Sequence, residues 1–517
     1  MFNRESRTKN VLRASFVGGT CNLINTLLGF IYRTIFIQVL SSNYLGINGL
    51  FSNILQILSF ADLGISTAIV YRLYEPISKN DVTKVGQLMN FFKKVYNGVA
   101  SIILVVGLSL LPFLNHFIKD SSEIPSDINL QEVYLLFLFQ TLSSYLFVYK
   151  QTILSADQKQ YIASLIQTLI SFLRYIFQVV ILIVTQKYIW TLVSSILLNL
   201  LLNFIFSEWV SHKYKEIFSI KESISKEEKK KIFDDTKATL CHKIGGTVLN
   251  STDNIILSRY AGIVATGLYS NYSMILSSLS RVLNQVFGSF TSSLGNAHVE
   301  QTKDQKYTSY RRLLFANLWI TSICTVCLYS LLNDFITIWL GSNMLLDSLT
   351  VTVLCIQFFM ETARIISTSY TNGCGLFIRD KIRPVIEAAI NLIVSIIMTN
   401  LLGIAGVFIG TIVSHLCTVF WREPYLLYRY EFGKSMQEYW IYYVLSALST
   451  IIMCAFFSRL SVCCFLSVYS LTGCFLKGLM IFIVGNIIVI ILFNKHPDFI
   501  FYKKLFLRKF NIWKVKK

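Results

Sequence analysis

Five basic residues lie deep inside the hydrophobic stretches of this sequence, where a charge is costly. They are Arg33, Arg174, Arg281, Arg364 and Lys477, against three comparably deep acids, Asp62, Asp253 and Glu361. Each charge costs roughly 2.5–3.5 kcal/mol at the centre of a membrane helix, so it needs a partner or water. Arginine suits phosphate because its planar guanidinium donates two parallel hydrogen bonds. The excess of buried cations predicts a hydrated cavity that binds an anionic group, with the four arginines as its cations.

Polar side chains repeat at helical spacing around these charges. In the stretch 263–294, Arg281 lies on a polar side of the helix, with large apolar residues opposite, and Arg174 lies on a similar stripe. The amides on these stripes are Asn250, Asn271, Asn284, Gln285 and Gln178. Such stripes are typical of helices around a water-filled cavity. A second interpretation stays open, in which polar groups join helices and Glu361 neutralises Arg364 three residues further on.

The elements that must position these residues are membrane helices. Of the 517 residues, 54% are hydrophobic and 15% charged, and the mean hydropathy is +0.56. Apolar runs of about 20 residues, enough to cross a bilayer core, recur along the chain. The predicted fold is an all-α polytopic membrane protein of about 14 transmembrane helices. The predicted spans are 15–39, 46–71, 95–117, 133–154, 161–186, 188–210, 238–260, 263–294, 312–333, 349–374, 385–402, 404–421, 440–459 and 464–493.

The net charge of +19 follows from this topology. When both termini are placed in the cytoplasm, only four of the 47 Lys and Arg residues fall in external loops: Lys119, Lys187, Arg259 and Arg459. Most of the others fall in cytoplasmic segments, as the positive-inside rule requires. The basic excess therefore indicates the orientation of the chain in a membrane, with both termini in the cytoplasm, and not a nucleic-acid partner.

The spans divide into two blocks of six, followed by two further spans. The sequence GLFSN at Gly49–Asn53 returns as GLYSN at Gly267–Asn271, and each copy opens the second span of its block. Two related six-helix lobes around a central cavity are a transporter arrangement. The predicted divisions are an N-lobe at 1–220, a cytoplasmic linker at 221–236, a C-lobe at 237–435, spans thirteen and fourteen at 436–493, and a basic cytoplasmic tail at 494–517.

No catalytic or metal-binding pattern accompanies these charges. The sequence has no Walker motif, no GxSxG elbow and no metal-spaced histidine cluster. Cys324 and Cys327 have CxxC spacing but lie in an apolar helix without a second ligand pair, so we interpret them as packing residues. We expect no enzyme activity, no metal and no cofactor.

Two stretches carry a family resemblance. Arg33–Asp81 and Val248–Leu276 resemble the polysaccharide-transporter (Wzx-type) flippases, in the superfamily that also holds multidrug and toxin extruders and lipid II flippases. The resemblance implies movement of a polyprenyl-pyrophosphate-linked oligosaccharide from the cytoplasmic to the outer leaflet. It implies that Arg174 and Arg281 bind the pyrophosphate, and that a polysaccharide polymerase and a chain-length regulator are partners. The glycan, whether O-antigen, capsule or exopolysaccharide, is not indicated.

Coupling and two alternatives stay open. An emptied carrier needs a return step, for which H⁺ or Na⁺ could bind at acidic or histidine side chains; the candidates are Asp62, Asp253, Glu361 and His415. A cation-coupled multidrug exporter would share the fold, but acids are expected to line its cavity. A membrane-embedded glycosyltransferase or polymerase would need catalytic groups at one membrane face.

Overall fold

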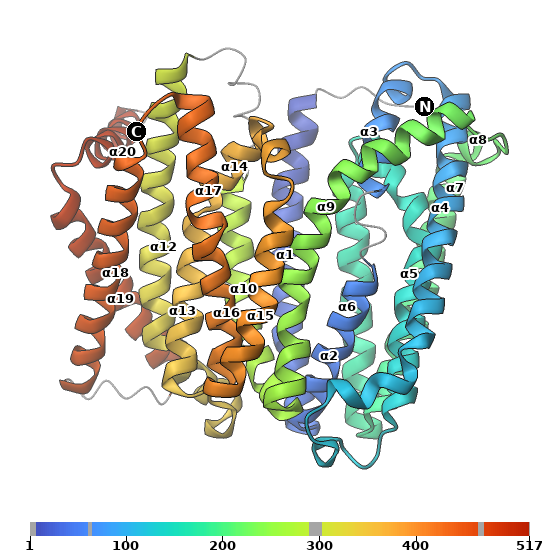
Figure 1. Cartoon of the computed structure of the whole chain (residues 1–517), viewed down its shortest axis with the longest axis horizontal. Helices are drawn as coiled ribbons and strands as arrows, with labels where there is room; N and C mark the ends of the chain where they lie inside the picture. Colours follow the sequence, from blue (N-terminus) through green and yellow to red (C-terminus); the bar gives the residue numbers. More distant parts are fainter. Residues whose placement is uncertain (1–6, 60–64, 289–301, 464–469, 516–517) are drawn as a thin grey trace. The chain divides into compact units, whose positions relative to one another are not determined.

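The computed structural model describes residues 7–59, 65–288, 302–463 and 470–515. Within these ranges the regular elements are all helices, and no strand occurs (Figure 1). The prediction of an all-helical fold is therefore confirmed. The chain forms two compact units, each described here by itself. Unit 1 comprises Met1–Ser270 and Lys381–Val407, and unit 2 comprises Asn271–Asp380 and Phe408–Lys517. The lobe boundaries inferred from the sequence stay a prediction.

Unit 1 is built from long helices with short connections. Its elements are α1 (Arg7–Val39), α2 (Ser42–Leu58), α3 (Ile65–Ser78), α4 (Val82–Ser109), η2 (Leu111–Phe117), η3 (Ser121–Glu123), α5 (Leu130–Ala156), α6 (Gln160–Thr185), α7 (Tyr188–Lys213), α8 (Lys215–Phe218), α9 (Lys226–Ile256), η4 (Leu257–Ala261), the start of α10 (Ile263–Gly288) and α15 (Arg383–Leu402). Its core is a continuous cluster of apolar side chains from α1 to α9.

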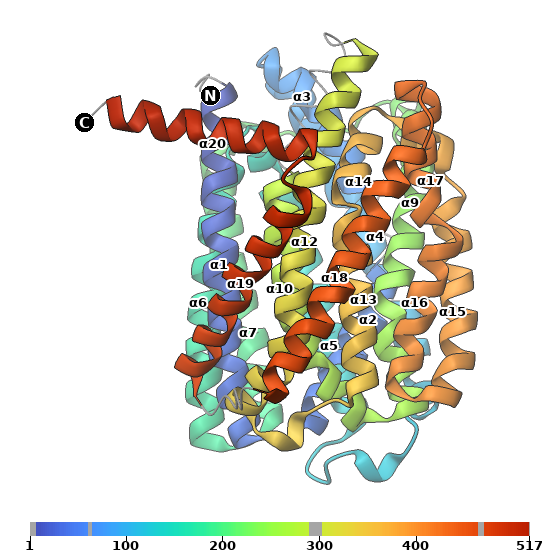
Figure 2. The same cartoon turned by 90° about the vertical axis from the view of Figure 1, so that its left-hand side faces the viewer.

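Unit 2 contains the end of α10 and most of the second half of the chain. Its elements are α12 (Lys303–Leu340), η5 (Ser342–Met344), α13 (Ser348–Ala363), α14 (Ile365–Gly373), η6 (Leu376–Asp380), most of α16 (Ile404–Cys417), α17 (Val419–Leu426), η7 (Leu427–Phe432), α18 (Gln437–Cys463), α19 (Leu471–Phe493) and α20 (Pro497–Val515). Figure 2 shows α20 lying across the end of α12, whereas α18 and α19 run alongside α12.

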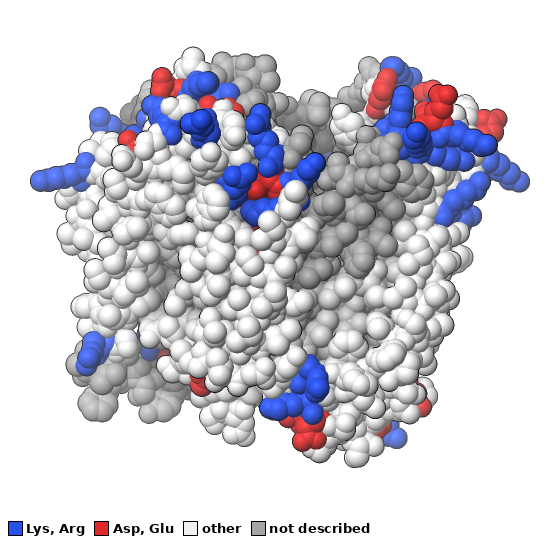
Figure 3. Space-filling model, in the orientation of Figure 1, with Lys and Arg blue, Asp and Glu red and all other residues white. Residues whose placement is uncertain are grey.

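Eleven helices in the described ranges are long and apolar enough to cross a membrane. They match eleven of the predicted spans. The other three, at 46–71, 238–260 and 263–294, coincide with α2 and α3, α9, and α10. These helices are more polar or border residues outside the described ranges, so the number fourteen stays a prediction. Figure 3 shows charged side chains near the helix ends, with a broad uncharged band between them.

The helix ends follow local sequence signals. Thr302 and Gln305 form a capping box at the start of α12, in which each side chain accepts from the other residue's backbone N–H. Asp347 caps α13 by accepting from Thr350 N. Gly341 ends α12 with φ +96°, a conformation that favours glycine.

The starts of α2 and α10 cross in close contact. A Cβ on Gly46 would meet the carbonyl oxygen of Ile263 at 2.1 Å, and a Cβ on Gly267 would meet that of Ser42 at 2.1 Å. This reciprocal contact relates the second helices of the two sequence blocks, because small residues let helix backbones approach in a membrane. The sequence repeat instead aligns Gly267 with Gly49, which lies three residues, or nearly one helical turn, after Gly46.

The acidic loop before α5 closes this crossing. Glu123 Oε2 accepts hydrogen bonds from Ile263 N at 2.5 Å and Val264 N at 3.1 Å, at the positive end of the α10 dipole. Asn43 Nδ2 on α2 donates to Glu123 O at 2.6 Å. The loop therefore has a structural role in joining α2 to α10.

Candidate functional site

A parallel pair of helices, α1 and α6, carries the polar groups that unit 1 brings together. Arg13 lies over the ring of Tyr161 at 4.3 Å, and the rings of Tyr32 and Tyr175 are 5.3 Å apart. Between these two contacts along the helix pair, Asn25 on α1 is hydrogen-bonded to Thr168 on α6. Nineteen residues separate Arg13 from Tyr32, roughly 28 Å along a helix, which is close to the thickness of a bilayer core.

A polar cavity of about 380 Å³ opens along this pair, between α1, α5 and α6. Its lining residues are Gly18, Cys21, Asn22, Asn25, Val148, Gln151, Thr152, Ser155, Gln160, Ala163, Ser164, Gln167 and Thr168. Five carboxamides and four hydroxyls supply its polar groups, and none of these lining residues is charged. Its volume lies within the usual range for small-molecule sites. We call it the amide cavity.

Hydrogen bonds between helices hold the carboxamides of the amide cavity in place. Gln167 Nε2 on α6 donates to Gln151 Oε1 at 3.0 Å and to Asn203 Oδ1 at 3.1 Å, and Gln151 Nε2 also donates to Asn203 Oδ1 at 3.1 Å. Asn25 Nδ2 on α1 donates to Thr168 Oγ1 at 3.2 Å, while the buried Asn25 Oδ1 has no hydrogen-bond partner. The network uses many of its donors internally and leaves an acceptor unsatisfied.

Arg174 continues the polar face of α6 beyond the amide cavity. It follows Gln167 by seven residues, two helical turns or roughly 10 Å along the axis. Its guanidinium carbon lies 5.3 Å from the centre of the Tyr175 ring, and its buried Nε has no hydrogen-bond partner. Gln178, one turn further, is half-buried. Unit 1 thus places a cation beside the cavity, on the stripe that the sequence predicted.

Arg33 has a structural contact. Its Nη1 donates to Ser270 Oγ at 2.7 Å, which ties α1 to α10. This hydrogen bond supports the interpretation of Arg33 as a link between helices. Arg33 also directly follows Tyr32, which contacts α6.

Unit 2 holds the other predicted polar face, on α10. Arg281 is exposed and its Nη2 donates to Ser278 Oγ at 3.0 Å. Asn284 and Gln285 are exposed, and Asn284 Nδ2 donates to Ser280 O on its own helix at 2.9 Å. Asn271 is fully buried. Since Arg174 and Arg281 belong to different units, their joint action on one phosphate group stays a prediction.

The helix that carries Glu361 and Arg364 is broken at Arg364. Helix α13 ends at Ala363 and α14 begins at Ile365. Asn317 Nδ2, on α12, donates to Thr362 O at 3.0 Å and Ala363 O at 2.8 Å, so it satisfies carbonyl groups that the break exposes. The sequence analysis missed Asn317, because one asparagine in an apolar helix gives no sign of its partner.

The charges at this break contact residues other than each other. Arg364 lies 4.0 Å from Glu423 on α17, and Thr368 Oγ1 donates to the same carboxylate at 2.8 Å. Glu361 Oε1 accepts from Gln357 Nε2 at 2.8 Å. Arg364 therefore has a carboxylate partner on another helix, Glu423, a buried residue that the sequence analysis did not single out.

The structure describes some, but not all, of the remaining residues that the sequence singled out. Lys477 on α19 forms a 2.7 Å ion pair with Asp334 on α12, so it serves to join these helices. Asp253 on α9 and His415 on α16 are buried. Asp62 and the side chain of Asn250 lie outside the described residues.

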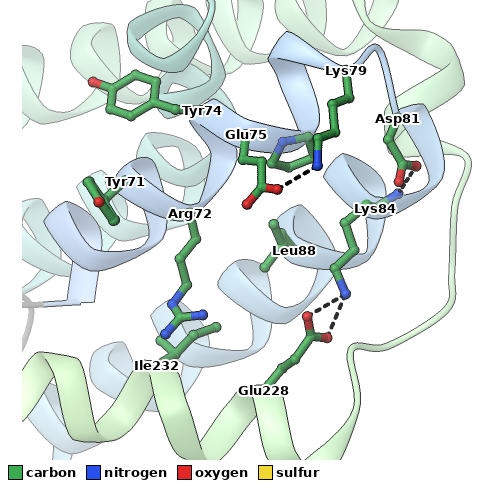
Figure 4. A pocket seen from close by; sticks show the side chains of 11 residues that line it. Tyr71, Arg72, Tyr74, Glu75, Lys79, Asp81, Lys84, Leu88, Glu228 and Ile232 are labelled. Atoms are coloured by element: carbon green, nitrogen blue, oxygen red, sulfur yellow. Dashed lines mark hydrogen bonds and ion pairs between the residues drawn. The ribbon is translucent and has the colours of Figure 1, made fainter.

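A second cavity, of about 580 Å³, lies where α3, α4 and α9 meet (Figure 4). Its charges are largely paired with one another. Lys84 bonds Glu228 and Lys79 bonds Glu75, each at 2.6 Å, and Asp81 accepts from Lys84 N at 2.9 Å. The hydrogen bond from Lys84 holds the pKa of the Glu228 carboxyl below its usual range. This cavity is a joint between helices, not an open anion site.

The segment before α9 is fastened to α4 as well. Gln87 Nε2 donates to Glu222 Oε2 at 2.8 Å, and Asn90 Nδ2 donates to Lys221 O at 2.7 Å. Ser225 caps α9 by accepting from Glu228 N. The segment predicted as a linker between lobes is thus docked on unit 1.

Comparisons with known proteins place these features in a family and a fold. A family described as "Polysaccharide biosynthesis protein" matches residues 11–290. A comparison with curated proteins finds no significant match.

Transporters are among the solved structures of similar fold. The lipid II flippase MurJ, in an inward closed conformation, is 14% identical with a TM-score of 0.65, covering 93% of this chain and 99% of that chain. An inward-facing multidrug resistance MATE family transporter of the MOP superfamily is 14% identical with a TM-score of 0.59, covering 80% and 98%. A MOP superfamily transporter from Pyrococcus furiosus, described as having a binding pocket of reverse polarity, is 15% identical with a TM-score of 0.51, covering 81% and 96%. At these identities the likeness shows a shared fold.

Proposed function

Because the chain belongs to the polysaccharide biosynthesis protein family, we propose that it is a flippase for a polyprenyl-pyrophosphate-linked oligosaccharide. The substrate moves from the cytoplasmic to the outer leaflet of a bacterial plasma membrane and supplies surface polysaccharide synthesis. The matched families and folds are those of transporters and flippases, not enzymes. A polymerase and a chain-length regulator would act on the product at the outer face.

The observation that carries the proposal is the polar face of α1 and α6. It combines an uncharged, amide-lined cavity with an arginine roughly 10 Å further along the same helix face. An oligosaccharide pyrophosphate has the matching pair of groups, a hydroxyl-rich sugar and an anion. Carboxamides both donate and accept hydrogen bonds, as hydroxyl groups do, and a guanidinium binds phosphate oxygens.

Arg281 and Arg364 are proposed as further cations on the route, with Asn271, Asn284 and Gln285 as polar contacts. Transport proceeds by alternating access of two lobes. The membrane potential of an inside-negative cell lowers the free energy of an anion that moves outward by about 2.3 kcal/mol per charge per 100 mV, so outward movement is favourable. H⁺ or Na⁺ at Asp253, Glu361 or His415 is proposed for the return of the empty carrier.

The test is a flipping assay in proteoliposomes. The probe is a fluorescent polyprenyl-pyrophosphate oligosaccharide whose label is quenched by a membrane-impermeant reductant. Purified protein is expected to increase the exchange of the probe between leaflets, and a K⁺ diffusion potential is expected to bias its direction. Transport of a cationic dye without transport of the probe would contradict the proposal and favour a multidrug exporter. Incorporation of labelled sugar into polymer by the purified protein would instead indicate an enzyme.

A further inference from the structure

The amide cavity differs from the arginine-bearing segment in one chemical respect. Its polar groups are the amides of Asn22, Asn25, Gln151, Gln160 and Gln167 and the hydroxyls of Thr152, Ser155, Ser164 and Thr168. None of the described residues that line it carries a formal charge. The cation of this face, Arg174, lies two turns beyond Gln167. Phosphate binding and sugar binding are therefore separated along α6.

Three of the five carboxamides in the cavity have NH₂ groups that already donate, which leaves fewer donors for an anion. The NH₂ groups of Gln151, Gln167 and Asn25 already donate to neighbouring oxygens. The Asn25 Oδ1 acceptor is left without a partner. A free acceptor attracts a hydroxyl or an acetamido N–H and repels a carboxylate. An ionised carboxylate held here without a cation would lose hydration that the cavity does not replace.

A free amine is disfavoured for the complementary reason. An ammonium group is best compensated by an acid, and none of the described residues that line the cavity is Asp or Glu. A hydroxyl both donates and accepts, so it can pair with an amide that retains either function. Neutral groups are the ones that this lining satisfies.

We propose that the sugar bound in the amide cavity carries no formal charge, being a neutral hexose or an N-acetylated amino sugar, and that the cavity selects against uronic acids and unacetylated amino sugars. This inference deepens, and rests on, the proposed flippase function. It assigns Gln167, Gln151 and Asn25 as specificity residues.

The experiment compares two probes of equal length on the same polyprenyl pyrophosphate, one ending in a glucose–N-acetylglucosamine disaccharide and the other in glucuronate–N-acetylglucosamine. Both flipping in proteoliposomes and equilibrium binding to protein in nanodiscs are measured. The wild type is expected to favour the glucose probe by about 5- to 150-fold, because an unpaired buried polar group costs about 1–3 kcal/mol. Equal rates and equal binding for both probes would overturn the inference.

A gain-of-function variant makes the test independent of folding losses. Gln167→Lys introduces a cation into the cavity, so its preference is expected to shift toward the glucuronate probe. Gln131→Lys is the matched control, because Gln131 is exposed at the start of α5 and does not line the cavity. An unchanged preference in Gln167→Lys, or the same shift in Gln131→Lys, would overturn the inference.

The two proposals fail in different ways. Flipping of both probes without preference would leave the flippase function standing and remove the inference. Selective binding of the glucose probe without any flipping would support the inference and contradict the transport function.

Discussion

Replacing Arg174 tests the anion-binding role of the polar face directly. In Arg174→Gln the side chain keeps hydrogen-bonding capacity but loses its charge. The buried Nε of Arg174 has no hydrogen-bond partner, and the guanidinium carbon lies 5.3 Å from the centre of the Tyr175 ring. Loss of this side chain therefore removes little internal bonding, and the structural cost is expected to be small.

The functional cost follows from the bond that the arginine would make. A hydrogen bond to a charged group contributes about 1.5–3 kcal/mol, which corresponds to about 10- to 150-fold in affinity. We expect Arg174→Gln to weaken binding of a polyprenyl-pyrophosphate oligosaccharide by this factor. Arg174→Lys keeps the charge but not the two-pronged geometry, so its loss is expected to be intermediate.

The assay is equilibrium binding and flipping of the fluorescent probe, with a polyprenyl alcohol oligosaccharide as the uncharged reference. Arg379→Gln is the matched control, because Arg379 also stacks on a tyrosine, Tyr430 at 4.3 Å, but is exposed in η6 of unit 2. Arg174→Gln is expected to lose selectivity for the pyrophosphate probe and to bind the uncharged reference normally, whereas Arg379→Gln is expected to behave like the wild type with both probes. An equal loss for both probes, or wild-type behaviour with both, would refute an anion-binding role for Arg174.

Three further predictions concern structure. Lys477→Gln is expected to lower the unfolding free energy by about 2 kcal/mol, because it leaves Asp334 unpaired; this value lies between those for exposed and buried ion pairs. The double variant Lys477→Gln/Asp334→Asn should recover most of this loss in a thermal melt. Gly46→Ala should cost about 1–3 kcal/mol by pushing α2 from the α10 backbone, whereas Gly98→Ala, with open space at its Cβ, should be neutral or stabilising in the same melt. The ion pair between Lys84 and Glu228 should contribute ~0.5 kcal/mol to the unfolding free energy at pH values above the ordinary glutamate pKa of about 4.3. Because the Glu228 pKa is lowered in the folded protein, this contribution should be lost as the pH falls through the lowered pKa. Amide exchange of 221–232 in wild type and Glu228→Gln should differ at neutral pH and converge in acid; a constant difference would contradict this assignment.

The sequence predicted the helical fold and the α6 stripe because both depend on local periodicity. Gln167, Arg174 and Gln178 share one face whatever they pack against, and the structure shows this face meeting α1 at Asn25. The apolar spans likewise follow from composition alone. Such features need no knowledge of the tertiary fold.

The partners of the polar residues could not be predicted in the same way. Gln151 and Asn203 come from two other helices, and the Arg364 partner Glu423 lies 59 residues further along the chain. Periodicity places a residue on a face but does not identify the helix opposite. An i, i+3 spacing suggested Glu361 as the partner of Arg364, but it could not show that the helix breaks at Arg364 or that Glu423 lies within 4.0 Å of it.

The central claim is that the glycan of a lipid-linked oligosaccharide lies against α1, α5 and α6. The most direct test is photo-cross-linking in proteoliposomes with a probe that carries a diazirine on its sugar, followed by peptide mapping. We predict adducts on residues 18–25, 148–155 and 160–168, and their loss when excess unlabelled oligosaccharide pyrophosphate is added. Adducts confined to other helices, or labelling that the unlabelled substrate does not reduce, would contradict the claim.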